Sequence, residues 1–182
     1  MFKSLKFFLF YPKIGPDMYL THWLLYIKTL RLWFQQKKLY KIGKNSEIRP
    51  FVTINGTNSI TIGDNVILQP GTLLSSLIND PDKGIVIEDN VLLGPNISIY
   101  SATHNFENIN LPIREQGYNA SKTTIKQGAW IGVNSVIMPG VTVGKNSVVA
   151  AGAIITRDIP DYCVAAGVPA KVIKRLGKEN VK

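Results

Sequence analysis

Aliphatic residues recur at every sixth position through most of the chain, a period that belongs to neither a helix nor a single strand. A helix repeats its apolar face about every 3.6 residues, and a half-buried strand does so at every second residue. A short strand followed by a turn fits a period of six, and three such units close one triangular coil. The pattern therefore predicts a parallel β-helix in which these anchor residues stack inward. The anchors are Ile42, Ile48, Ile54, Ile62, Leu68, Leu74, Ile87, Leu93, Ile99, Ile125, Ile131, Ile137, Val143, Val149 and Ile155.

Residues between the anchors support the same prediction. Small or β-branched residues stand four positions after most anchors, where a second inward position is expected. Turn-forming sequences such as Gly63-Asp64-Asn65 and Pro139-Gly140 lie between anchors. An irregular β-sandwich is the alternative for a chain with so many turns. Six consecutive units in phase from Ile125 to Pro160 argue against that alternative.

The period is interrupted at three places. The step to the next anchor grows to eight residues after Ile54, thirteen after Leu74 and twenty-six after Ile99. The last interruption leaves an extruded loop at 104–122, which begins with His104. Long loops inside a regular solenoid usually carry function, so the functional residues are expected here.

The first forty residues precede the repeat and predict a segment of their own. An apolar hook at Phe7–Tyr11 is followed by helical spacing over about 18–40, and basic residues flank the apolar stripe. Such a helix suits a membrane interface, and it equally suits packing against the prism or a neighbouring subunit. The stripe comprises Leu20, Trp23, Leu24, Ile27, Leu30 and Phe34, with Lys28, Arg31, Lys37 and Lys38 beside it. We expect three regions: the basic amphipathic helical segment 1–40, the β-helix 41–160 and a C-terminal tail 161–182.

The net charge of +9 is concentrated at the N-terminus. Residues 1–44 carry nine Lys or Arg against Asp17 alone (+8), whereas residues 45–182 carry twelve against eleven (+1). A nucleic-acid-binding domain spreads positive charge over a folded face, so no nucleic-acid partner is expected.

The single cysteine, Cys163, excludes an internal disulfide and favours a reducing compartment. Neither a secretory signal nor a membrane-spanning run is recognisable, so we expect a cytoplasmic protein.

Several motifs together resemble those of the hexapeptide-repeat O-acetyltransferases, the maltose, galactoside and xenobiotic acetyltransferases and their relatives in capsule and lipopolysaccharide synthesis. The resemblance covers residues 42–176. It implies a left-handed parallel β-helix, acetyl-CoA as the acetyl donor, a sugar hydroxyl as the acceptor, and no metal. It also implies a homotrimer with each site at a subunit junction. The motifs are His104-Asn105-Phe106-Glu107, Leu111-Pro112-Ile113-Arg114, Gln116-Gly117, Trp130-Ile131-Gly132, Pro139-Gly140-Val141, Thr156-Arg157-Asp158-Ile159-Pro160 and Ala165-Ala166-Gly167-Val168-Pro169-Ala170-Lys171.

His104 is the candidate catalytic base. An alcohol is a poor nucleophile until its proton is being removed, and imidazole, with an unperturbed pKa of about 6.5, suits that task. His104 opens the long loop, as the catalytic histidine of the resembling family does, and the only other histidine, His22, lies outside the repeats. Glu107 is a candidate for contacting the acceptor or orienting the imidazole, although a backbone carbonyl would serve equally. Gln69 stands where relatives resembling galactoside acetyltransferase place an acceptor-binding asparagine.

The resemblance also implies a cofactor slot beside the last coils. Small residues there would let pantetheine approach backbone N–H groups, which hold the thioester oxygen as charge develops. Basic residues would bind the phosphates, although a solvated basic tail is the alternative for them. Trp130 could equally pack between subunits. The candidates are Trp130, Gly132, Val133, Ala151, Gly152, Thr156, Arg157, Lys171 and Lys174.

The expected function is therefore O-acetylation of a sugar hydroxyl, and the resemblance implies a role in surface polysaccharide biosynthesis. A zinc-dependent γ-type carbonic anhydrase would use the same fold, but it needs three histidine ligands and this chain has two histidines. A sugar-nucleotide N-acetyltransferase and a non-catalytic membrane-associated scaffold remain alternatives.

Overall fold

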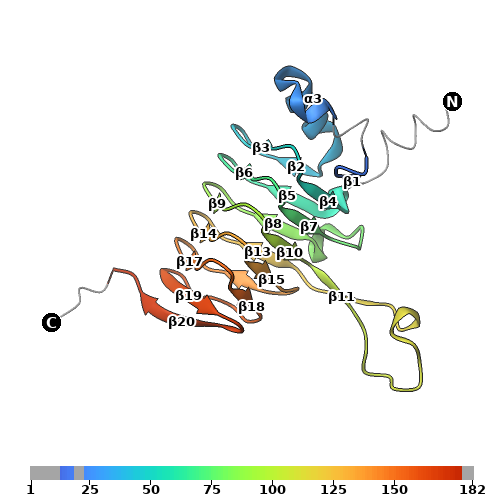
Figure 1. The fold of residues 1–182 in the computed structure, drawn as a ribbon, viewed down its shortest axis with the longest axis vertical. Coiled ribbons are helices and arrows are strands. Elements are labelled where there is room, and N and C mark those ends of the chain that lie inside the picture. Colours follow the sequence, from blue (N-terminus) through green and yellow to red (C-terminus); the bar gives the residue numbers. More distant parts are fainter. Residues whose placement is uncertain (1–12, 19–22, 178–182) are drawn as a thin grey trace.

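The computed structural model describes residues 13–18 and 23–177 and shows a parallel β-helix whose coils stack one above another (Figure 1). Within the described residues, five successive coils each contribute three short strands. They are β2 (Lys41–Ile42), β3 (Glu47–Ile48) and β4 (Thr53–Asn55); β5 (Ile60–Ile62), β6 (Ile67–Leu68) and β7 (Leu73–Ser75); β8 (Ile85–Ile87), β9 (Leu92–Leu93) and β10 (Ser98–Tyr100); β13 (Thr123–Ile125), β14 (Trp130–Ile131) and β15 (Val136–Ile137); β16 (Thr142–Val143), β17 (Val148–Val149) and β18 (Ile154–Ile155).

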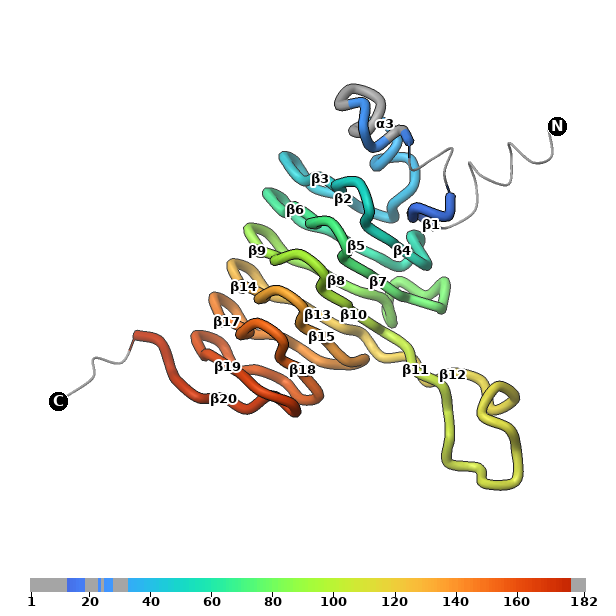
Figure 2. The backbone as a smooth tube through the Cα atoms, in the orientation of Figure 1, coloured from blue at the N-terminus to red at the C-terminus, as the bar shows by residue number. Residues whose placement is uncertain are grey.

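The coils stack in register and build three faces, which the chain visits in a fixed order. Face 1 contains β2, β5, β8, β13 and β16; face 2 contains β3, β6, β9, β14 and β17; face 3 contains β4, β7, β10, β15 and β18. Every pair within these sets is parallel. Figure 2 shows the same stacking along the whole prism. The vertex between faces 3 and 1 consequently lies opposite face 2.

The predicted anchors form the core. All of them from Ile48 to Ile155 are at most 2% exposed, and the partly buried Ile42 packs against this core in the first coil. Burying one such side chain contributes roughly 1.5–3 kcal/mol, so the inward column is the main source of stability. Asparagines at the vertex between faces 1 and 2 adopt a positive φ, 58° at both Asn65 and Asn90, and the Asn65 side-chain amide donates to Asn90 at 2.9 Å. This position suits asparagine because a tight corner needs the left-handed conformation.

The N-terminal segment caps the first coil. Strand β1 (Lys13–Ile14) pairs antiparallel with β4, and the short 3-10 helix η1 (Leu24–Tyr26) precedes α3 (Lys28–Lys38). Phe34 and Gln35 are buried, and the Gln35 side-chain amide donates to the Ile48 carbonyl at 3.1 Å. The described part of the helix expected over about 18–40 is therefore interrupted: η1 and α3 are separated by Ile27, whose backbone is extended (φ −101°, ψ 104°), and residues 19–22 lie outside the described residues. The hook at Phe7–Tyr11 and Leu20 lie outside the described residues.

Lys38 departs from its expected place among exposed basic flanks. Its side chain is buried, and desolvation lowers its pKa from 10.5 to about 8. The cap instead exposes three aromatic side chains, Trp23, Tyr26 and Trp33, by 67%, 57% and 55%, and we call these three residues the aromatic patch. Packing of this segment against the prism thus accounts for its buried side, but it does not explain the exposed aromatic patch. In the described part of the chain, no helix has the length and apolarity to cross a bilayer.

The three interruptions of the period have different structures. The first two form the short 3-10 helices η2 (Thr57–Ser59) and η3 (Pro81–Lys83). The third is a hairpin of β11 (Ala102–His104) and β12 (Tyr118–Ala120), with η4 (Ile113–Glu115) near its tip. We call residues 102–120 the arm; it projects from the vertex between faces 3 and 1 (Figure 1). Beyond the coils, β19 (Cys163–Gly167) continues face 2 in parallel with β17, and β20 (Ala170–Arg175) returns antiparallel to it.

Candidate active site

His104 is the last residue of β11 and is exposed where the arm leaves the prism. Its Cα partner across the hairpin is Tyr118, the first residue of β12. The two rings lie 4.3 Å apart between centroids, with 38° between their planes. Tyr118 was not among the residues expected from the sequence, because only the pairing of two strands fourteen residues apart brings it to the imidazole.

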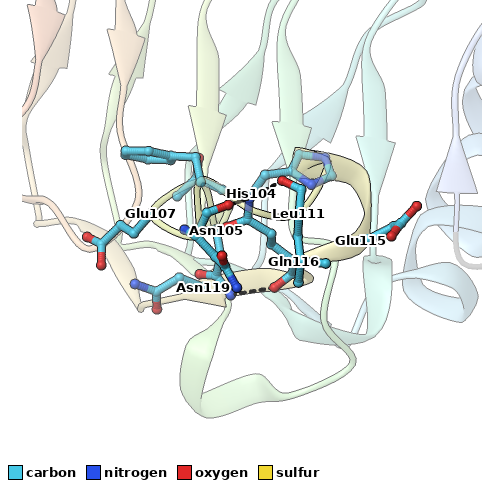
Figure 3. A pocket seen from close by; sticks show the side chains of 10 residues that line it. His104, Asn105, Glu107, Leu111, Glu115, Gln116 and Asn119 are labelled. Atoms are coloured by element: carbon cyan, nitrogen blue, oxygen red, sulfur yellow. Dashed lines mark hydrogen bonds between the residues drawn. The ribbon is translucent and has the colours of Figure 1, made fainter.

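Two pockets meet at His104. The arm pocket has a volume of about 580 Å³ and is rich in polar groups, among them Asn105, Glu107, Gln116 and Asn119 (Figure 3). A second, mostly apolar pocket of about 270 Å³ lies between the root of the arm and the prism. Its lining comprises Ser75, Leu77, Tyr100, Ala102, Thr103, His104, Met138 and Pro139. The imidazole can therefore contact a polar molecule on one side and an apolar group on the other.

Hydrogen bonds within the arm give the polar pocket a defined shape. The Gln116 side-chain amide donates to the carbonyls of Asn108 and Leu111, both at 2.9 Å, and its oxygen accepts from the Asn108 N–H at 3.0 Å. Asn105 donates from its side chain to the Gln116 carbonyl at 2.9 Å. One glutamine side chain thus fixes three backbone groups of the loop. The sequence names Gln116 in a motif but does not show what it bonds.

The root of the arm is held by buried hydroxyl groups. Thr123 donates to the Tyr100 carbonyl at 2.7 Å and accepts from the Gly140 N–H at 3.0 Å. Ser101 donates to Ser76 at 2.9 Å, and Ser59 donates to the same hydroxyl at 2.7 Å. Each of these four hydroxyl-bearing side chains is at most 2% exposed. In the sequence, this cluster could have been recognised from the small polar residues that occupy inward positions in three coils.

The two acceptor candidates lie in different places. Glu107 lines the arm pocket, but Figure 3 shows its carboxylate directed away from His104, and no hydrogen bond joins the two residues. Gln69 follows β6 on face 2, and its side-chain oxygen accepts from the Arg49 guanidinium at 2.7 Å. Within one chain, Gln69 is therefore separated from His104 by the width of the prism.

Most cofactor candidates gather on face 2 and at its vertex with face 3. Trp130 projects outward from β14, half exposed, between its register partners Leu92 and Val148. The same register continues through Val164 to Lys174, so an apolar stripe ends at a cation. Leu92, Trp130, Val148 and Val164 are the apolar members of this face 2 stripe.

The small residues at the neighbouring vertex have two different roles. A Cβ on Gly132 would lie 2.6 Å from the Ala151 backbone nitrogen, so stacking of the coils alone requires glycine there. Gly152 has no atom within 4 Å of its would-be Cβ, and its N–H donates to the Val133 carbonyl at 2.8 Å. Of these two glycines, Gly152 is the one whose surroundings leave open space beside the backbone.

The remaining candidates are exposed. Thr156 and Arg157 follow β18 at the vertex that carries the arm, whereas Lys171 lies on β20 opposite Ala166. The side chains of Thr156, Arg157 and Lys171 form no hydrogen bond or ion pair with any described residue. These cations are consequently available to an anionic ligand. Among the described residues, no group of three His, Cys, Asp or Glu side chains is placed to hold a metal ion.

Comparison with known proteins places the chain in a family. A family model described as bacterial transferase hexapeptide (six repeats) matches residues 122–157. Galactoside O-acetyltransferase of Lactococcus lactis subsp. lactis is 34% identical over 150 residues, which are 80% of this chain and 68% of that protein. A provisionally named lipopolysaccharide biosynthesis O-acetyl transferase of Escherichia coli K12 is 30% identical over 138 residues, 75% of this chain and 60% of that protein.

A solved structure agrees with these sequences. Galactoside acetyltransferase in complex with coenzyme A matches with a TM-score of 0.74 and 32% identity, over 85% of this chain and 78% of that one. The chain spans between 37% and 68% of the length of the first four curated relatives it matches. The predicted fold is confirmed, and the chain belongs to the hexapeptide-repeat acetyltransferase family, with that family's left-handed parallel β-helix.

Proposed function

We propose that this protein transfers the acetyl group of acetyl-CoA to a hydroxyl group of a saccharide, with His104 as the general base. The observation that carries this proposal is the position of His104, exposed and shared by a polar and an apolar pocket. A base must reach both the hydroxyl that it deprotonates and the space in which that oxygen meets the acetyl carbon. The relatives named for galactoside O-acetylation support the reaction class.

The chemistry is a direct transfer in which His104 holds the proton. Its imidazole takes the proton from the acceptor hydroxyl as the oxygen attacks the thioester carbon. Backbone N–H groups stabilise the negative charge that develops on the carbonyl oxygen. The carbon–sulfur bond then breaks, and the imidazolium returns the proton to the departing thiolate. The products are an acetyl ester and the free thiol of CoA.

CoA binding would use the face 2 stripe and the exposed cations. Trp130 and its apolar neighbours offer a surface for pantetheine, and the open backbone at Gly152 lies at the adjoining vertex. Arg157, Lys171 and Lys174 would bind the phosphates, since none of them is engaged by another described side chain. The solved relative in complex with coenzyme A supports this choice of cofactor.

A complete site requires more than one chain, and we propose a homotrimer. His104 leaves the vertex opposite face 2, whereas Trp130 lies on face 2, so one chain does not assemble them around a single ligand. Two different surfaces on opposite sides of one subunit suit a head-to-tail contact, and such contacts close into rings. Each junction would combine the arm of one subunit with face 2 of its neighbour.

The acceptor is proposed to be a saccharide of a surface polysaccharide pathway, reached at the membrane. The aromatic patch is exposed on the cap, and residues 1–44 carry a net charge of +8. Aromatic side chains and basic residues together favour the interface of an anionic bilayer. The inner face of the cytoplasmic membrane would bring a lipid-linked acceptor within reach of the arm.

An acceptor screen with radiolabelled acetyl-CoA tests the reaction class. Matched pairs of sugars that differ only in a hydroxyl or an amino group should show transfer to the hydroxyl, and the product should be labile to mild base, as an ester is. Selective transfer to amines would favour the N-acetyltransferase alternative. Binding of acetyl-CoA without turnover on any sugar would favour the scaffold.

A further inference from the structure

The imidazole of His104 has no hydrogen-bonding partner among the described residues. A catalytic histidine is commonly oriented by a carboxylate or carbonyl that accepts a hydrogen bond from its second ring nitrogen. Glu107, the carboxylate nearest in the chain, points away in the arm pocket (Figure 3). Among the described residues, the contact of this ring is therefore with an aromatic side chain and not with a hydrogen-bond acceptor.

The backbone that carries His104 is already fixed. The arm pairs through three consecutive Cα partners that end at His104 and Tyr118, and the next N–H, that of Asn105, donates to the Gly117 carbonyl at 3.1 Å. Below the hairpin, the Ser121 N–H donates to the Ser101 carbonyl at 2.9 Å. The only freedom left to the imidazole is rotation about its two side-chain torsions.

The Tyr118 ring restricts that rotation. Its ring centroid lies 4.3 Å from that of the imidazole with 38° between the planes, slightly closer than the separations of about 4.5–7 Å that are typical of aromatic pairs. Directly opposed side chains on paired antiparallel strands interact in this way, so the contact follows from the register. We propose that Tyr118 is a positioning residue that holds the imidazole of His104 in its reactive orientation through ring contact.

This inference rests on the proposed role of His104 and adds a consequence for the reaction. Because the contact uses the ring face, both ring nitrogens remain free to exchange protons with substrates and water. The tyrosine hydroxyl has no part in it, so phenylalanine should replace tyrosine and a non-aromatic residue should not. A stacking platform for the acceptor sugar is the competing role, and it would change acceptor binding instead of turnover.

Three substitutions separate these roles. Tyr118→Phe should keep kcat within about twofold. Tyr118→Val, which retains the strand preference of a β-branched residue, should lower kcat about tenfold and leave the acceptor KM within about twofold. Tyr162→Ala is the matched control, since Tyr162 is 46% exposed against 49% for Tyr118 and lies at the vertex between faces 1 and 2, not at the vertex that carries the arm. It should match the unsubstituted protein in turnover.

Proton–carbon-13 correlation NMR of protein labelled with carbon-13 histidine reports the contact between the two rings without relying on activity. The chain has two histidines, so the His104 ring can be assigned by substitution. Its ring protons should show an upfield ring-current shift that persists in Tyr118→Phe and disappears in Tyr118→Val. Full activity of Tyr118→Val, a raised acceptor KM as its main defect, or an equal loss in Tyr118→Phe would each overturn the positioning role. Unchanged turnover of His104→Ala would instead refute the role of His104 as the general base, whereas the ring-current shift would still report the contact between the two rings.

Discussion

Replacing Thr123 with valine should loosen the root of the arm and lower stability by a predictable amount. The hydroxyl is fully buried, donates to the Tyr100 carbonyl at 2.7 Å and accepts from the Gly140 N–H at 3.0 Å. Valine has nearly the same shape, so the change removes two hydrogen bonds without leaving a large cavity. Each buried partner left unsatisfied costs about 1–3 kcal/mol, which gives roughly 2–4 kcal/mol for the pair after partial relaxation.

Thermal unfolding at one fixed protein concentration measures this cost, because oligomers unfold in a concentration-dependent way. For a domain of this size, 1 kcal/mol corresponds to about 2–4 °C, so Tm should fall by roughly 4–16 °C. Thr124→Val is the matched control, because its side chain lies on the outer side of the same strand and makes no recorded hydrogen bond. It should change stability by no more than about 0.5 kcal/mol.

The same substitution should also reduce turnover. The Ser121 N–H bond to Ser101 closes the hairpin beside Thr123, so hydrogen exchange at Ser121 should accelerate in Thr123→Val. His104 would then sample more positions relative to the prism, and kcat should fall while the affinity for acetyl-CoA is retained. If Thr123→Val is as stable and as active as Thr124→Val, the hydroxyl does not hold the arm.

Three further predictions follow from the candidate site. His104→Ala should remain folded and bind acetyl-CoA but turn over at least about 100-fold more slowly, and the activity of the unsubstituted protein should fall on acidification because only neutral imidazole accepts a proton. Joint replacement of Arg157 and Lys171 by alanine should raise the KM for acetyl-CoA more than it lowers kcat, and an unchanged calorimetric affinity would show that the phosphates bind elsewhere. Alanine at all three positions of the aromatic patch should abolish cosedimentation with anionic liposomes while turnover of a soluble acceptor persists; if the unsubstituted protein ignores such liposomes, the membrane proposal is wrong.

The repeat was predictable from sequence because each coil is specified locally. An inward anchor such as Ile131 sits within a few residues of its own turn, and its neighbours above and below obey the same pattern. The loop that begins at His104 was found as an interruption of this pattern. The sequence could not show that the loop is a hairpin, because the pairing of His104 with Tyr118 depends on register across fourteen residues that carry no repeat.

The N-terminal segment shows where a periodicity argument fails. Helical spacing correctly identified Phe34 as a buried position, but it did not predict that α3 begins only at Lys28. It also placed Lys38 among exposed cations, whereas its long side chain is buried at the cap, with a lowered pKa. An amphipathic pattern predicts a helix with one apolar side that is buried and a polar side that is exposed. The N-terminal segment instead packs against the prism on one side and exposes aromatic side chains on another.

The insertion after Ile99 explains why this fold needs a partner chain to complete the proposed site. A regular solenoid presents only flat faces, and an insertion at one corner can build a pocket only beside that corner. Here the insertion leaves the vertex opposite face 2, and the surface suited to the cofactor lies on face 2. The arm does not fold back across the prism, and its hairpin projects away from the coils (Figure 1). Head-to-tail association would resolve this geometry: in the homotrimer that we propose, the arm that leaves one subunit would meet the cofactor surface of the next, and trimer formation would be a condition for catalysis.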